Sequence, residues 1–421
     1  MKNLLLIIIL HSSFLILNCF AQQPGWEIIP SGTTSEFKSI HFINQFDLYL
    51  CGDVFLNVKS TDGGLTWQVT SFPTTITLND IAVIDQNIVV TVGDGGTILR
   101  TTDGGNSWVA INSGVTDDLL SVSFVDSFGI CGGRYQTILH TSNSGASWNI
   151  AQSGFWGGFL GASMLSPQIG FVAGENSIFQ PLLGRTTDSG QSWDFTAFYL
   201  NNNEGRATGV DFTDMFVGYA SARVWDGRGA IAKTTNSGSN WVTTFFTKPL
   251  WGIDFPISSA SLIGYAAGDS GKIFKTYNAG DSWQQQQSGT TSKLNKVYFI
   301  DLDNGFAVGE NGLILRTTTG GEPATNFENS NPAPFTFELS QNYPNPFNPS
   351  TVISWQSAVS SWQILKVFDV LGNEVVTLVD EHRPAGSYDV EFDGTGLPSG
   401  IYFYRLISGS YSSTKKMILM R

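Results

Sequence analysis

Acidic, basic and aromatic side chains recur at fixed positions along this chain of 421 residues. The stretch TTDGGNSW at 101–108 has close copies elsewhere in the sequence. They lie at 60–67, 141–148, 186–193, 234–241 and 276–283, with a truncated copy at 317–321. A residue with a basic side chain precedes each copy. These residues are Lys59, Arg100, His140, Arg185, Lys233, Lys275 and Arg316.

The repeated basic positions have two interpretations in a protein whose net charge is −13. One is a basic ring or arc that binds an acidic peptide or glycan. The other is architectural, with each side chain lying between neighbouring repeats and pairing with an acid. The acids expected as partners are Asp53, Asp94, Glu175, Asp269 and Glu310. We favour the second interpretation, because a feature present in every repeat is more often part of the scaffold than a site.

Paired carboxylates are the other arrangement that could support catalysis, since glycoside hydrolysis needs two acids flanking one bond. Asp117 and Asp118 are adjacent, but they fall in an expected loop, where a solvated turn is the simpler interpretation. The sequence contains no G-x-S-x-G, P-loop or H-E-x-x-H motif. Its four histidines lack metal-ligand spacing. We therefore expect no catalytic residue, cofactor or metal site.

Composition limits the partners further. A pI near 4.6 argues against nucleic acid, because phosphate binding needs a basic face. Cys51 and Cys131 occupy matching positions of the first and third repeats, too far apart to bridge, so we expect two buried thiols and no disulfide. We expect a monomer.

Residues 1–21 have the pattern of a signal peptide. Lys2 supplies the positive start, and an apolar run from Leu4 to Leu17 follows. We expect cleavage after Ala21. A lipoprotein signal with an acylated Cys19 is the alternative, although Asn18 stands where a small residue is wanted.

The spacing of the repeats predicts the elements that position these side chains. The motif tryptophans recur at spacings of about 40 to 48 residues. They are Trp67, Trp108, Trp148, Trp193, Trp241 and Trp283. Each period holds an alternating apolar run, a strand of small residues ending in glycine, a strand leading into the motif and a strand after the tryptophan. Four short strands per repeat, without helical periodicity, predict the blades of an all-β propeller.

The chain ends predict how the propeller closes. WEIIPSGTTSEFKSIHF at 26–42 matches WQQQQSGTTSKLNKVYF at 283–299, whereas the seventh motif copy lacks a tryptophan strand. We therefore expect residues 25–31 to supply the outer strand of the last blade. This closure predicts a seven-bladed propeller over residues 22–322, with no open sheet edge at the seam.

Irregularities in the repeat indicate a candidate ligand site, because loops of a repeat protein differ where they bind. The fourth and fifth repeats are longer, and the additional residues fall in loops expected to share one face. The candidate residues are Trp156, Tyr199, Arg206, Arg223, Trp225, Asp226, Arg228 and Trp251, with Phe155 and Asn201 to Asn203 nearby. Aromatic rings beside arginine, aspartate and asparagine suit a sugar or a peptide. The alternative is tolerated loop insertions, with Trp156 and Trp251 packed in the core.

The remaining residues form a linker at 323–338 and a small domain at 339–421. Alternating Tyr, Phe and Val with turn pairs such as Pro-Ser-Gly predict a small antiparallel sandwich for this domain.

Two family resemblances follow from these motifs. The S/T-x-D-x-G-x-S-W repeat is the Asp-box, or bacterial neuraminidase repeat, and the longer phrase around it resembles the propeller of photosystem II assembly factors. Sialidases share the Asp-box, but the Arg-Ile-Pro start that they need is absent. Xyloglucan-degrading Asp-box enzymes use two propellers, for which this chain is too short.

The C-terminal region closely resembles the type A sorting domain of the type IX secretion system of Bacteroidetes. The matching segments are Asn342–Pro349, Phe368–Gly372 and Leu397–Tyr402. This resemblance implies export, contact of 339–421 with the type IX machinery, removal of the domain by a cut in the linker, and release or attachment at the outer surface of a Gram-negative cell. We expect a non-catalytic propeller that binds an extracellular protein or glycan. The alternative is a glycan-active hydrolase.

Overall fold

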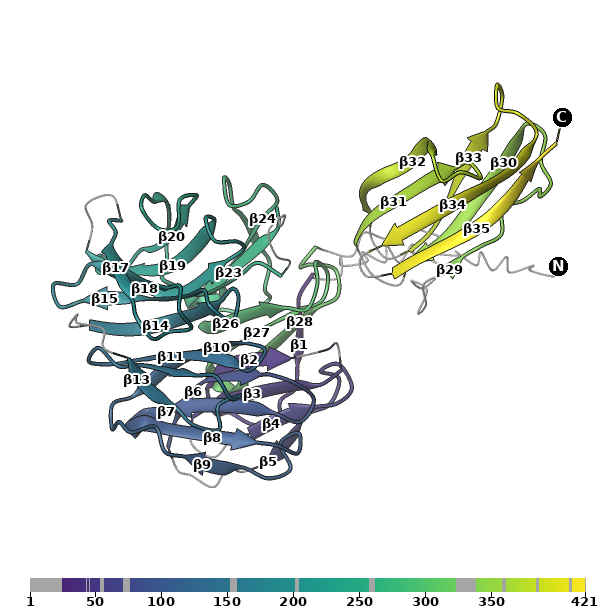
Figure 1. Ribbon diagram of the computed structural model, residues 1–421. Helices are drawn as coiled ribbons and strands as arrows, with labels where there is room; N and C mark the ends of the chain where they lie inside the picture. The colour runs from purple at the N-terminus through teal and green to yellow at the C-terminus, as the bar shows by residue number, and fades with distance from the viewer. Residues whose placement is uncertain are drawn as a thin grey trace, which may run out of the picture.

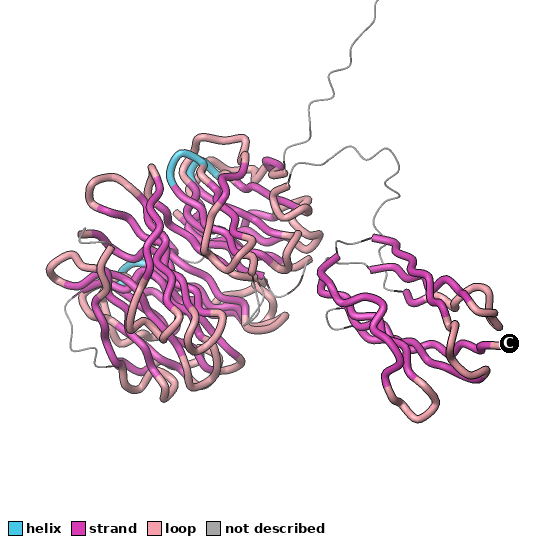
Figure 2. Tube along the Cα trace, turned by 90° about the horizontal axis from the view of Figure 1, so that it is seen from above, coloured by secondary structure: helices cyan, strands magenta, loops and turns pink. Residues whose placement is uncertain are grey.

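The structure of the protein is a computed structural model that describes residues 25–42, 44, 46–53, 57–70, 76–151, 157–200, 204–256, 262–322, 338–357, 361–383, 386–408 and 411–420. The expected signal peptide and nearly all of the expected linker lie outside these residues. The described part is almost entirely β, and its helical segments are three-residue turns (Figure 2). None of the described segments is a helix of the length and apolarity needed to cross a membrane.

Seven four-stranded antiparallel sheets follow one another along residues 27–317 (Figure 1). Blade 1 contains β2 (Phe37–Phe42), β3 (Leu48–Gly52), β4 (Asn57–Ser60) and β5 (Gln68–Thr70). Blade 2 contains β6 (Leu78–Val83), β7 (Val89–Gly93), β8 (Thr97–Thr101) and β9 (Val109–Ile111). Blade 3 contains β10 (Leu119–Val125), β11 (Phe128–Gly133), β12 (Ile138–Thr141) and β13 (Asn149–Ala151). Blade 4 contains β14 (Gly157–Met164), β15 (Gly170–Asn176), β16 (Pro181–Thr186) and β17 (Asp194–Ala197).

The later blades keep this order. Blade 5 contains β18 (Gly205–Phe212), β19 (Gly218–Val224), β20 (Gly229–Thr234) and β21 (Val242–Phe246). Blade 6 contains β22 (Leu250–Asp254), β23 (Gly264–Gly268), β24 (Ile273–Thr276) and β25 (Gln284–Gln286). Blade 7 contains β26 (Leu294–Phe299), β27 (Gly305–Gly309), β28 (Ile314–Thr317) and β1 (Glu27–Ile29). The sequence prediction of a seven-bladed, all-β propeller is confirmed.

The first strand of each blade packs against the first strand of the next, so these strands form the inner wall of the ring. Each carries a β-bulge near its start, as between Leu119 and Ser121 in β10. The second strands are almost wholly buried, and Leu48–Gly52 is buried along its whole length. Their small and β-branched residues therefore allow neighbouring blades to pack closely.

Each Asp-box is a hydrogen-bonded turn between the third and fourth strands. In blade 2, the Thr101 hydroxyl donates to Asp103 (2.7 Å) and accepts from the backbone N–H groups of Asp103 and Gly105 (3.2 and 3.0 Å). The Asp103 carboxylate accepts from the N–H and hydroxyl of Ser107 (2.8 and 2.5 Å), and these bonds lower the pKa of Asp103 to about 2. Trp108 donates its indole N–H to the Gly105 carbonyl, where φ is 90°.

This geometry predicts the effect of removing one hydroxyl. Replacing the buried Thr101 with the isosteric valine leaves the N–H groups of Asp103 and Gly105 without their acceptor. We expect a loss of about 1–3 kcal/mol in the free energy of unfolding, measured by urea denaturation. Thr102→Val at the exposed neighbouring position is the control, and equal losses in the two variants would contradict the hydroxyl's role.

The ring closes through the N-terminal strand, as the sequence predicts. β1 pairs antiparallel with β28, with Glu27 opposite Arg316 and Ile29 opposite Ile314, and the two strands lie side by side in Figure 1. Trp26 is buried at the position of the missing motif tryptophan and donates its indole N–H to the Gln286 side chain of blade 6 (2.9 Å). Gly25 lies so close to Gly321 that a Cβ atom would stand 2.0 Å from its carbonyl oxygen.

Cys51 and Cys131 are both buried and free, as expected. The C-terminal region is a sandwich of two antiparallel sheets, which also agrees with the sequence prediction. One sheet contains β29 (Glu338–Leu339), β30 (Ser350–Ser357) and β33 (Gly386–Asp393). The other contains β32 (Glu374–Arg383), β31 (Ser361–Phe368), β34 (Gly400–Ser408) and β35 (Tyr411–Leu419).

The proline-rich motif at 342–349 covers the outer edge of the last strand, β35. Phe347 donates its N–H to the Ile418 carbonyl and accepts from the N–H of Met420, both at 2.9 Å. The Asn345 side chain accepts from the N–H of Ile418 (3.0 Å). These contacts use backbone groups that would otherwise form an open edge.

Candidate functional site

Five of the seven basic residues that precede the Asp-boxes contact the next blade. Lys59 donates to the Gly104 carbonyl (2.9 Å) and Arg100 to the Ser144 carbonyl (2.7 Å), in each case in the Asp-box of the next blade. Lys275 donates to the Gly320 carbonyl (3.0 Å), and Lys233 bonds Asp281 (2.6 Å). Inter-blade placement therefore agrees with the architectural interpretation, but the expected acids are not the partners.

The other three basic positions are also partly buried. His140 packs against Gly190 of the following Asp-box, where a Cβ atom would come within 2.8 Å of the His140 Cβ. Arg316 lies opposite Glu27 in the closing ladder. Arg185 lies opposite Phe171 in the β15–β16 ladder, and its buried Nε has no hydrogen-bond partner among the described residues. None of the seven is an exposed side chain.

The loops at the opposite end of the blades form the mouth of the ring. Here the turn between the second and third strands meets the connection that enters the first strand of its own blade; for example, the Asp269 N–H donates to the Pro249 carbonyl in blade 6 (3.0 Å). In blades 2, 6 and 7 this turn is short and contains glycine. These turns are η1 (Asp94–Gly96), η2 (Asp269–Gly271) and η3 (Glu310–Gly312).

Two arginines and two tryptophans come together at the mouth between blades 5 and 6. Arg206 and Arg223 lie directly opposite each other in the β18–β19 ladder. The Arg206 guanidinium lies 5.7 Å from the ring centre of Trp225 and 5.6 Å from that of Trp251. The Arg223 guanidinium lies 5.3 and 6.0 Å from the same two rings. Lys293 adds a third cation, 4.3 Å from the Trp251 ring. We call these five residues the mouth cluster.

Three acids lie beside the mouth cluster, and one of them, Glu36, approaches Lys293 at 3.8 Å. Glu175 approaches Arg206 at 3.9 Å, and Asp269 accepts the indole N–H of Trp251 (2.6 Å). Burial lowers the pKa of Arg206, with a further decrease from Arg223, whereas Glu175 opposes the decrease. Burial also raises the pKa of Glu175 against the effect of the arginines. The buried Arg206 Nε and Glu175 Oε2 have no hydrogen-bond partner among the described residues.

The other predicted site residues lie apart from the cluster or outside the described residues. Asp226 and Arg228 form an exposed ion pair (2.6 Å), and the Arg228 guanidinium lies 4.4 Å from the Phe245 ring centre. Tyr199 is exposed. Trp156, Phe155 and Asn201 to Asn203 lie outside the described residues.

Sequence reasoning missed Tyr135, Ile178, Phe179 and Lys293. Tyr135 lies in the β11–β12 turn, and Ile178 and Phe179 lie in the β15–β16 turn, all exposed. The signal was available: the short glycine turn of blades 2, 6 and 7 is replaced in blades 3, 4 and 5 by RYQ, NSIF and WDGR.

The carboxylates of the inner wall serve the ring itself. Asp211 accepts the N–H of Phe255 in the next blade (2.8 Å), and Asp254 accepts that of Phe299 (2.9 Å). Asp80 accepts the N–H of Val122 (2.9 Å) and lies 3.7 Å from Lys296. Burial raises the pKa of both Asp211 and Asp254, that of Asp211 to about 6. No cluster of three potential metal ligands occurs among the described residues.

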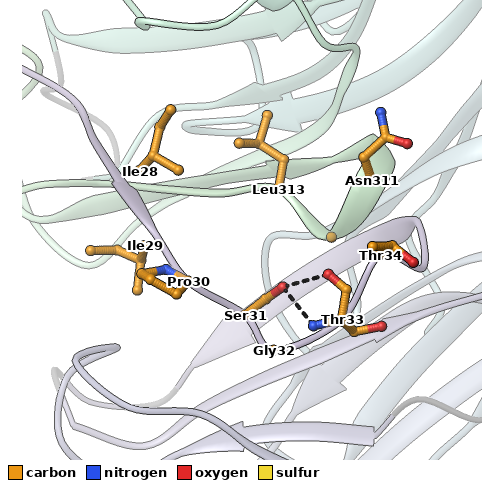
Figure 3. A pocket seen from close by; sticks show the side chains of 10 residues that line it. Ile28, Ile29, Pro30, Ser31, Gly32, Thr33, Thr34, Asn311 and Leu313 are labelled. Atoms are coloured by element: carbon orange, nitrogen blue, oxygen red, sulfur yellow. Dashed lines mark hydrogen bonds between the residues drawn. The ribbon is translucent and has the colours of Figure 1, made fainter.

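A surface pocket beside the closing strand offers few groups that could take part in binding or catalysis (Figure 3). It is lined by residues 28–34 and 311–313, none of them charged, and the Ser31 hydroxyl bonds within its own turn to Thr33. The matching turn of blade 6, at 270–272 and 285–291, forms a similar hollow. Because the hollow recurs with the repeat, it belongs to the scaffold.

Fold and motifs together define the class: an Asp-box propeller followed by a C-terminal sorting domain of the type IX secretion system. The family described as photosynthesis system II assembly factor YCF48 matches residues 66–153 and 254–318. The family described as secretion system C-terminal sorting domain matches residues 341–420. None of the curated proteins matches the chain.

Solved structures agree on the fold. "YCF48 bound to D1 peptide" is 20% identical, has a TM-score of 0.58 and is aligned over 71% of this chain and 98% of its own. YCF48 from Cyanidioschyzon merolae is 18% identical, with a TM-score of 0.56 over 69% and 98%. The Niastella koreensis GH74 enzyme is 14% identical, with a TM-score of 0.53 over 93% and 74%. The sorting domain indicates export by the type IX system.

Proposed function

We propose that this protein is a non-catalytic binding propeller, exported by the type IX system to the outer surface or the medium of a Gram-negative cell, and that its ligand is an anion that docks at the mouth cluster. The observation that carries the proposal is the pairing of Arg206 with Arg223. Like charges directly opposite each other in a sheet are destabilising, and here they are also partly buried. A bound anion would remove that cost.

Other features support the same ligand chemistry. The chain is acidic as a whole, yet three cations converge on Trp225 and Trp251. The unpartnered Arg206 Nε is a donor placed for a charge-assisted hydrogen bond. A YCF48 structure holds a peptide, which shows that a similar propeller can serve as a binding scaffold. The described wall carboxylates are engaged as backbone acceptors, so no specific observation favours the hydrolase alternative.

Removing the paired cations tests the proposal. The secreted protein would be applied to arrays of acidic and neutral glycans and peptides, as wild type and as the Arg206→Gln/Arg223→Gln variant. Because a charge-assisted hydrogen bond contributes about 1.5–3 kcal/mol, we expect binding to acidic ligands to weaken at least about tenfold. Arg228→Gln is the control, since Arg228 is paired with Asp226 outside the cluster. Unchanged binding in the double variant would refute the mouth cluster as the site.

A further inference from the structure

Three successive blades carry exposed aromatic rings at the mouth, at the same place in each blade. Tyr135 of blade 3 is 66% exposed, Phe179 of blade 4 is 54% exposed and Trp225 of blade 5 is 40% exposed. Each follows the second strand of its blade. We call these three residues the aromatic arc. Blades 2, 6 and 7 have only the short glycine turns η1, η2 and η3 at this place.

Two of the three arc residues, Tyr135 and Phe179, have backbone conformations that bulky residues disfavour. Tyr135, Gln136 and Phe179 have φ values of 50°, 73° and 60°, in the left-handed region that bulky side chains rarely occupy. The matching turns of blades 2, 6 and 7 also take positive φ, but they do so at smaller residues, which are Gly95, Ser270 and Asn311. Strained backbone of this kind persists where surrounding structure holds it and concentrates at binding sites.

Hydrogen bonds to the start of the next blade hold two of the three turns. The Gln136 N–H donates to the Gly157 carbonyl at the start of blade 4, and the Gly205 N–H donates to the Phe179 carbonyl (both 2.9 Å). Phe179 contacts Trp225 edge to face, with ring centres 5.9 Å apart. The rings are therefore presented on fixed supports, which lowers the entropy lost when a ligand binds.

The first and third rings of the arc each have an arginine close by. Arg134 precedes Tyr135 and is 53% exposed, although it pairs with Asp118 (3.0 Å). Arg223 lies under Trp225, whereas the charged residue before the Phe179 turn is the acid Glu175, which approaches Arg206 (3.9 Å). Aromatic rings thus recur over three blades, with an arginine at each end of the arc. A ligand made of repeating units, each with an apolar face and polar or anionic substituents, matches this recurrence.

We infer that the aromatic arc extends the mouth cluster into a binding site for a linear acidic polysaccharide. This inference rests on the proposed function, because the mouth cluster supplies the anion recognition. The C–H face of a sugar ring packs on the negative face of an aromatic ring, while its carboxylate or sulfate meets a guanidinium. An acidic peptide would also pair with the cations, but its sequence would have to alternate apolar and acidic residues along its length.

Chain length is the quantity that tests the inference. Oligogalacturonates, heparin fragments and oligosialic acids of increasing length would be titrated into the full secreted protein, with poly-glutamate of matched length as the peptide probe. We expect affinity for one of the three glycan series to rise with length. Tyr135→Ala and Phe179→Ala should each reduce the affinity of the longer chains about tenfold and leave the shortest unchanged. Phe46→Ala and Phe216→Ala are matched controls, also 54% exposed but located at the Asp-box end of the blades.

The outcomes separate the two proposals. If the Arg206→Gln/Arg223→Gln variant loses acidic ligands while the arc variants keep the affinity of the longer chains, the anion site stands and the extended site is refuted. Tighter binding of poly-glutamate than of any glycan series would also overturn the glycan assignment. If the protein bound none of these probes and no ligand on the arrays, both the anion site and the extended polysaccharide site would be refuted.

Discussion

Replacing Trp26 with alanine is expected to lower the free energy of unfolding of the propeller by about 3–5 kcal/mol, the usual cost of truncating a buried tryptophan. Trp26 is 1% exposed, packs edge to face on Phe299 and donates to Gln286. It also anchors β1, the strand that completes blade 7. Loss of this anchor weakens the pairing of β1 with β28, where the two ends of the propeller chain meet, and exposes the edge of β28.

Urea unfolding of the full chain checks this expectation. Ile28→Ala is the control, since Ile28 lies in the same strand but is exposed, and surface substitutions usually change stability by about 0.5 kcal/mol or less. A destabilisation by Trp26→Ala no larger than that of Ile28→Ala would mean that the N-terminal strand contributes little to closure.

Replacing Asp211 with asparagine is expected to stabilise the propeller at neutral pH. Burial raises the pKa of Asp211 from 3.8 to about 6, so the folded state binds a proton more tightly than the unfolded state does. Between pH 4 and pH 6 the wild type therefore loses stability as pH rises, and above pH 6 the loss is complete. A shift of this size corresponds to roughly 3 kcal/mol, and asparagine keeps an oxygen that can accept the Phe255 N–H.

The measurement compares urea unfolding of the two proteins at pH 4.5 and pH 7.5. We expect Asp211→Asn to gain up to about 3 kcal/mol over wild type at pH 7.5 and much less at pH 4.5. The pKa of Asp254 should also fall in the variant, because the Asp211 charge is one of the causes that raise it. A gain that is the same at both pH values would show that the substitution acts through packing and not through charge.

Local signals in the sequence were enough for most of the fold. The Asp-box turn is made from residues within eight positions of one another, so its hydrogen bonds, such as those of Thr101 and Asp103, follow from the sequence. Closure by residues 25–31 was also predictable, because the match of 26–42 to 283–299 identifies the missing strand.

The candidate site was only partly predictable. Arg206, Arg223 and Trp225 were found because they lie in the longer fifth repeat, with Trp251 just after it, and the four residues do come together. Tyr135 and Phe179 were missed because the turns that follow the second strands were not compared between repeats. The partners of Lys59 and Arg100 were also missed, since the carbonyls they bind lie more than 40 residues along the chain.

The repeat, the turn chemistry and the closure followed from the sequence, because each depends on near neighbours or on an internal copy, and the sorting domain followed from short motifs that resemble a known family. Which loops of different blades meet became visible only in the folded ring. That meeting stacks two opposed arginines on two tryptophans and aligns three rings along one rim. The ring geometry is the cause, because it places loops of successive blades side by side although no periodicity of the chain relates their residues.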